Sequence, residues 1–80
     1  MPTTSPNAKN SSLIAFGTAV RAARKARRIS QEELAHSCGV DRSYLGAIER
    51  GEQNCGLLHL VKISEALRMT LAELIATAGL

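Results

Sequence analysis

The sequence predicts an all-α domain of five short helices. Helix-start signals, in which a Ser, Thr or Asp precedes a stretch with helical periodicity, recur along the 80 residues. Apolar residues repeat at intervals of three and four, and no segment alternates as a β-strand does. A chain of this length forms one domain with a small core. That core must be aliphatic, because the chain has one Phe, one Tyr and no Trp.

The first helix is expected over residues 12–27, with Ser12 as its N-cap. Its apolar stripe repeats at helical intervals and consists of Leu13, Phe16, Val20 and Ala23. Residues 1–11 are polar and rich in Thr, Ser, Asn and Pro, which is typical of a flexible arm. The expected organisation is therefore an arm over 1–11 and a folded domain over 12–80.

The second and third helices are expected close together. Ser30 and Glu33 form a capping box, in which each side chain accepts a hydrogen bond from the other residue's backbone N–H. The helix over residues 31–37 ends before Gly39, which tolerates a left-handed backbone. Asp41 then caps a helix that runs to residue 50. Two short helices joined by such a turn form a helix-turn-helix, whose second helix can lie in the major groove of DNA.

The last two helices supply much of the remaining core. The helix over residues 57–67 is expected to bury four apolar positions, which are Leu57 or Leu58, Leu60, Ile63 and Leu67. Thr70 and Glu73 form a second capping box and start a helix over residues 71–78. The apolar stripe of this helix consists of Leu71, Leu74 and Ile75.

Spacing inside the helix-turn-helix satisfies several constraints in one register. Ala35 is small where the helices cross, and the apolar positions that fasten the third helix are Val40, Leu45 and Ile48. Helical geometry turns Glu49 inward with them. It turns outward Arg42, Ser43, Gly46, Ala47 and Arg50. Gly46 can be explained by close approach of the backbone to DNA, or else by tight packing or by simple tolerance of a glycine.

Position and charge identify candidate DNA contacts. Arg42 and Ser43 lie in the first turn of the third helix, which usually probes base edges, and Arg can bind guanine in bidentate fashion. Gln31 lies at a helix N-terminus, which favours an anion, and Tyr44 is a second candidate for phosphate. Net charge is +3, and half of the Lys and Arg fall within eight residues, namely Arg21, Arg24, Lys25, Arg27 and Arg28. Such a run can be a solvated helix face, but beside a helix-turn-helix we interpret it as a phosphate-facing patch.

Other classes of function lack their signatures. The two Cys and two His have no zinc-site spacing, and we expect free thiols at Cys38 and Cys55. No catalytic set or phosphate loop is present, so we expect neither an enzyme nor a cofactor, a metal or a small-molecule ligand. No apolar stretch suits a membrane span or a secretion signal. A cytoplasmic protein is the resulting expectation.

The motifs together resemble a known family. Ser-Gln-Glu-Glu-Leu-Ala at 30–35, Gly-Val at 39–40 and Ile-Glu-Arg-Gly at 48–51 occur in the order typical of Cro/C1-type (XRE) helix-turn-helix domains of phage repressors. The resemblance implies a lambda-repressor-like five-helix bundle. It also implies a partly buried ion pair between Arg24 and Glu49.

Within that family, the Asp-Arg-Ser-Tyr run at 41–44 most resembles the controller proteins of restriction–modification systems. These are small dimers that switch genes from paired palindromic sites. The resemblance implies DNA contacts at Arg42, Ser43 and Asn54, while Gln53 stands where a basic residue is common and Arg28 where Gly is common. The complete candidate DNA-binding set is Arg28, Gln31, Asp41, Arg42, Ser43, Tyr44, Gly46, Arg50, Gln53 and Asn54.

The expected function is therefore sequence-specific regulation of transcription by a homodimer on palindromic operators in double-stranded DNA. We expect the dimer interface on the last two helices, at Leu71, Leu74, Ile75 and Leu80. An acidic surface near Glu49 or Glu52 is a hypothesis for a contact with RNA polymerase. The alternatives are a phage-type repressor, an antitoxin, and a protein-interaction module that has lost DNA binding.

Overall fold

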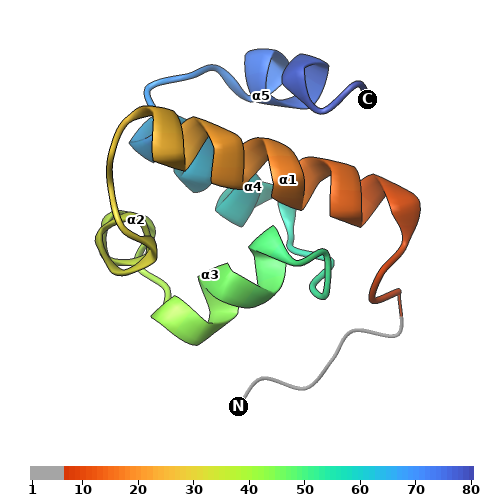
Figure 1. The fold of residues 1–80 in the computed structure, drawn as a ribbon, viewed down its shortest axis with the longest axis horizontal. Helices are drawn as coiled ribbons and strands as arrows, with labels where there is room; N and C mark the ends of the chain where they lie inside the picture. The colour runs from red at the N-terminus through yellow and green to blue at the C-terminus, as the bar shows by residue number, and fades with distance from the viewer. Residues whose placement is uncertain (1–6) are drawn as a thin grey trace.

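The computed structural model describes residues 7–80, and this part of the chain is all-α. Its helices are α1 (Ser11–Ala26), α2 (Gln31–Cys38), α3 (Arg42–Glu49), α4 (Leu57–Ala66) and α5 (Leu71–Thr77). Each boundary lies within one residue of the expected one. The long helix α1 crosses the middle of the molecule, with α2 and α3 on one side and α5 on the other (Figure 1). Helix α4 packs against α2 and α5.

Local hydrogen bonds explain where the helices begin. Both capping boxes are present: Glu33 N–H donates to Ser30 Oγ at 3.0 Å, and Glu73 N–H donates to Thr70 Oγ1 at 3.0 Å. The expected N-cap at Ser12 is wrong. Asn10 caps α1 instead, because its Oδ1 accepts the Ser12 N–H at 2.9 Å and thereby starts the helix one residue earlier.

The core is one aliphatic cluster around Phe16, fed by every helix. Its fully buried apolar side chains are Val20, Leu34, Leu45, Ile48, Ile63, Leu67 and Leu74. The expectation that Leu57 or Leu58 is buried is wrong, since they are 66% and 77% exposed. The first turn of α4 follows Gly56, which provides no side-chain cap, and the buried residues of this helix begin further along it.

Helices α1 and α3 touch backbone to backbone at Gly17. A Cβ atom at this position would lie less than 3.0 Å from the carbonyl oxygens of Ile48 and Glu49. Backbone atoms cannot rotate aside as a flexible side chain can. The absence of a side chain at Gly17 therefore sets the position of α3 relative to the rest of the domain.

The N-terminal segment is described only from Asn7 onward, so most of the arm expected over 1–11 lies outside the described residues. Residues 7–10 precede α1 and lie against the end of α3, where Lys9 N–H donates to the Gly51 carbonyl. None of the described helices is long and apolar enough to cross a lipid bilayer. Cys38 and Cys55 are both free thiols.

Candidate nucleic-acid interface

The first turn of α3 presents side chains to solvent, and hydrogen bonds to the N-cap residue Asp41 fix its position. Arg42 and Ser43 are exposed. Asp41 Oδ1 accepts hydrogen bonds from Tyr44 N–H and from the Ser43 hydroxyl, both at 2.8 Å. These bonds, the Tyr44 backbone bond first, lower the pKa of Asp41. Asp41 is therefore ionised at neutral pH and fixes the position of the first turn.

A buried ion pair supports α3 from behind. Arg24 Nε donates to Glu49 Oε2 at 2.7 Å, and its Nη2 donates to Glu49 Oε1 at 3.2 Å. The third nitrogen, Nη1, donates to the Ile29 carbonyl at 2.9 Å. The residues are 9% and 7% exposed. The ion pair implied by the family resemblance is thus present, and it joins α1, the loop before α2 and α3.

Gln31 extends this network to the surface. Its Nε2 donates to Glu49 Oε1 at 2.9 Å, and its Oε1 lies 3.5 Å from Nη1 of Arg42, at the long limit of a hydrogen bond. A side-chain amide oriented by a buried carboxylate therefore faces the exposed guanidinium of the first turn. The chain of contacts runs from Arg24 through Glu49 and Gln31 to Arg42.

The expectation that Gly46 and Ala47 face outward is wrong, because both are buried. A Cβ at Gly46 would lie 3.1 Å from Nη1 of Arg50 and 3.7 Å from Oε1 of Gln31. These two side chains fold over Gly46 and cover it. Beside Ala47 the chain turns back, and Glu52 N–H donates to the Ala47 carbonyl at 2.9 Å. Of the explanations offered for Gly46, tight packing under polar side chains fits this structure.

The polymerase hypothesis loses much of its basis. Glu49 is buried inside the ion pair, and Glu52 bonds to Arg50 at 3.0 Å. Neither carboxylate forms an unpaired acidic surface.

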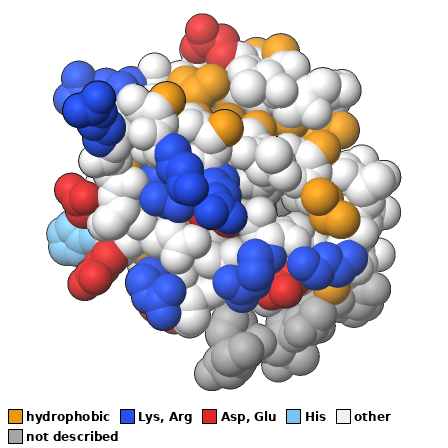
Figure 2. Space-filling model, viewed as in Figure 1, with side chains coloured by type: hydrophobic (Ala, Val, Ile, Leu, Met, Phe, Trp, Pro, Cys, Tyr) orange, Lys and Arg blue, Asp and Glu red, His pale blue; other side chains and the backbone are white. Residues whose placement is uncertain are grey.

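Further basic groups lie on α1 and on the loop that follows it. The exposed cations of α1 and the following loop are Arg21, Lys25, Arg27 and Arg28, whereas Arg24 is buried. Arg28 has φ +59, which explains why glycine would suit this position. Figure 2 shows Lys and Arg side chains over the end of α1 and over the side on which α3 lies, and acidic and His side chains over the edge on which α2 lies. Hydrophobic side chains gather toward α5.

Of the remaining candidate DNA contacts, Tyr44 and Gln53 are less exposed to solvent than Asn54. Tyr44 is half-buried with its ring centroid 5.6 Å from that of His59, and burial raises its pKa. After α3, Gln53 is half-buried and Asn54 is exposed.

Sequence reasoning missed two residues that shape this surface. Gly17 places α3 through a backbone contact between segments far apart in the sequence, and Lys9 bonds to the end of α3 from the segment interpreted as an arm. In the sequence Gly17 stands between Phe16 and Thr18, and neither neighbour predicts a backbone contact with a distant segment.

A short helix with an exposed first turn, set by a tight turn against its partner helix and supported by a buried ion pair, defines a helix-turn-helix DNA-binding domain. Proteins with such a domain form the class of DNA-binding transcriptional regulators, and this chain is one of them. Residues 20–74 match the family model described as "HTH_3: Helix-turn-helix", and the chain belongs to this family.

Two curated relatives that are similar to this chain are both control proteins. The control protein C.SmaI of Serratia marcescens is 38% identical over 61 residues, which cover 76% of this chain and 73% of the relative. The control protein C.MunI of a Mycoplasma species is 42% identical over 62 residues, which cover 76% of this chain and 84% of the relative.

Solved structures of regulatory proteins have a fold similar to that of this chain. The restriction-modification controller protein C.AhdI from Aeromonas hydrophila superimposes with a TM-score of 0.78 at 42% identity, covering 80% of this chain and 97% of that one. SinR, a master regulator for biofilm formation solved in complex with DNA, gives a TM-score of 0.69 at 37% identity, covering 74% of this chain and 95% of that one.

Proposed function

We propose that this chain is a homodimeric regulator that reads paired inverted half-sites in DNA and controls the genes of a restriction–modification system. The observation that carries the proposal is the first turn of α3, where Arg42 and Ser43 are exposed on a helix that is packed against the core and bonded through the ion pair. A regulator of this kind works in the cytoplasm, where it meets its operator.

Arg42 is the proposed reader of sequence. Its guanidinium can donate two parallel hydrogen bonds to O6 and N7 of guanine in the major groove. Ser43 reads a neighbouring base after its hydroxyl leaves Asp41.

Polar and basic groups of α2, of α3 and of the segments beside them are the proposed contacts to phosphates. These are Gln31, Tyr44, Arg50, Gln53, Asn54 and Arg28, with the exposed cations of α1 adding long-range attraction. Contacts to phosphate fix the register of a protein on the duplex but carry no sequence information.

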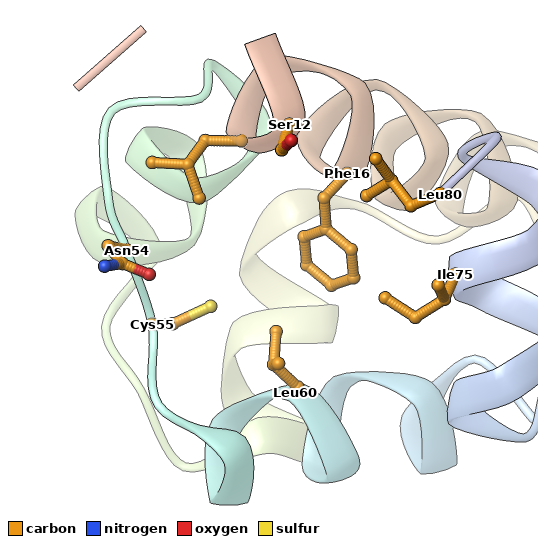
Figure 3. A pocket seen from close by; sticks show the side chains of 8 residues that line it. Ser12, Phe16, Asn54, Cys55, Leu60, Ile75 and Leu80 are labelled. Carbon is orange, nitrogen blue, oxygen red and sulfur yellow. The ribbon is translucent and has the colours of Figure 1, made fainter. Parts of the chain in front are cut away.

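The proposed dimer surface needs one change from the sequence expectation. Leu74 is completely buried in the core and cannot reach a second subunit. Leu71, Ile75 and Leu80 remain, and Leu80 is 56% exposed. Ile75 and Leu80 line a pocket of about 150 Å³ with Phe16 and Leu60, which point into it from α1 and α4 (Figure 3).

A second copy of the chain is the proposed occupant of this pocket. A domain of 80 residues buries little apolar surface alone, so pairing adds stability. Two recognition helices would then meet half-sites about 34 Å apart, one turn of DNA.

Selection from a random pool of DNA duplexes tests the proposal. We expect the purified protein to enrich an inverted repeat with half-sites about one turn apart. Arg42→Ala should weaken binding to that site by about 1–3 kcal/mol and relax the requirement at one base position of each half-site.

Arg27→Ala provides the matched control, since it removes one exposed positive charge from the end of α1 and should keep the ranking of sequences. The proposal fails if the folded wild-type protein enriches nothing, and that outcome favours a protein-interaction module. A reporter assay then tests the controller role: the enriched site should occur, and act, upstream of restriction–modification genes.

A further inference from the structure

Three charged side chains meet at the C-terminal end of α3. Arg50 Nε donates to Glu52 Oε1 at 3.0 Å, and its Nη2 lies 3.0 Å from the same oxygen. Lys9 Nζ lies 3.5 Å from the other oxygen, Oε2. One carboxylate therefore faces two cations. The hydrogen bond from Arg50 is the main cause that lowers the pKa of Glu52, so this carboxylate is ionised at neutral pH.

Backbone contacts hold Lys9 in this cluster. Its N–H donates to the Gly51 carbonyl at 2.6 Å, and its Nζ donates to the Arg50 carbonyl at 2.9 Å. Lys9 has φ +66, a left-handed conformation that L-residues with a side chain rarely adopt. The bonds to the end of α3 compensate for this conformation, and the end of a helix attracts a cation. The position of Lys9 is therefore specific.

The cluster borders the proposed DNA-facing surface. Arg50 reaches back along α3 until its Nη1 covers Gly46, next to the side chain of Gln31. The Lys9 and Arg50 side chains are 57% and 53% exposed, while that of Glu52 is 27% exposed. Both cations are thus accessible to a polyanion, but each is already paired with the carboxylate of Glu52.

We propose that Glu52 competes with DNA phosphates for Lys9 and Arg50 and thereby suppresses non-specific binding. The inference rests on the proposed function, because it assumes that α3 approaches a duplex. Carboxylate and phosphate oxygens are the same kind of acceptor for ammonium and guanidinium donors. Sequence-independent affinity comes from cations that neutralise phosphates, so an intramolecular anion on two of them lowers it. Base contacts at Arg42 and Ser43 are left to carry a larger share of the binding free energy.

Glu52→Gln tests the proposal, because it keeps the size of the side chain and removes its charge. Binding to a scrambled duplex is measured by fluorescence anisotropy over a range of salt concentrations. We expect tighter binding, and a plot of log K against log salt whose slope steepens by about 0.9 for each cation released, hence by up to about 1.8. The ratio of operator affinity to scrambled-duplex affinity should fall. The double variant Lys9→Met/Glu52→Gln should lose about half of the added slope.

Glu65→Gln is the matched control, since Glu65 is exposed on α4 and the change in net charge is the same. The proposal is overturned if Glu52→Gln leaves the slope unchanged, or if Glu65→Gln changes it equally. Failure of the proposed function has a different signature: the wild-type protein would prefer no sequence, whereas the slope on scrambled DNA would still respond to Glu52→Gln.

Discussion

Replacing Glu49 with Ala should destabilise the domain by about 3–5 kcal/mol, the range for breaking a buried ion pair by removing one partner. Glu49 accepts hydrogen bonds from two nitrogens of Arg24 and from Gln31. Without it, the buried guanidinium keeps only its bond to the Ile29 carbonyl. Native domains are stable by only about 5–15 kcal/mol, so this loss is a large fraction of the total.

Thermal and urea unfolding followed by circular dichroism measures the effect. For a domain of this size, 1 kcal/mol corresponds to about 4–8 °C in Tm, so the melting temperature should fall by about 12 °C or more. The double variant Arg24→Met/Glu49→Leu should recover most of the loss, because it leaves no charge unpaired.

Glu65→Ala, at an exposed carboxylate on α4, should change the free energy of unfolding by no more than about 0.5 kcal/mol. The reasoning is refuted if Glu49→Ala melts with the wild type. It is equally refuted if the double variant is no more stable than Glu49→Ala.

Three further substitutions test separate contacts. Gly17→Ala should destabilise by about 1–3 kcal/mol in the same unfolding assay, because its Cβ collides with the backbone of α3; an unchanged melt would contradict the close contact. Gln31→Ala should weaken binding to all duplexes by a similar factor in anisotropy titrations, and a loss confined to one sequence would argue against a phosphate contact. Leu80→Asp should convert the proposed dimer to a monomer in sedimentation, and an unchanged mass would move the interface elsewhere.

Local signals made the helices predictable. A capping box needs only residues three apart, so Ser30 with Glu33 and Thr70 with Glu73 could be identified before any tertiary contact was known. The ion pair of Arg24 and Glu49 spans 25 positions, and only the family resemblance pointed to it.

Burial was harder to predict, because it depends on which elements cover a surface. Helical geometry placed Gly46 on the outward side of α3, but in the structure it is buried, because long side chains from Gln31 and Arg50 fold over it. Leu74 and Leu80 both suit an apolar interface by type, yet one faces the core and the other faces solvent. Such differences arise from helix packing. A periodic pattern identifies the apolar face of a helix, but it does not identify which residues of that face another element covers.

Helix α3 keeps the residues that hold the fold apart from those proposed to read DNA. Leu45, Ile48 and Glu49 are buried, whereas Arg42 and Ser43 contribute nothing to the core. New DNA-sequence preferences can therefore be engineered by randomising the exposed pair, since substitutions there leave the core of the domain intact. A set of genetic switches could be built on this one scaffold, in which each variant binds a different DNA sequence and acts independently of the others.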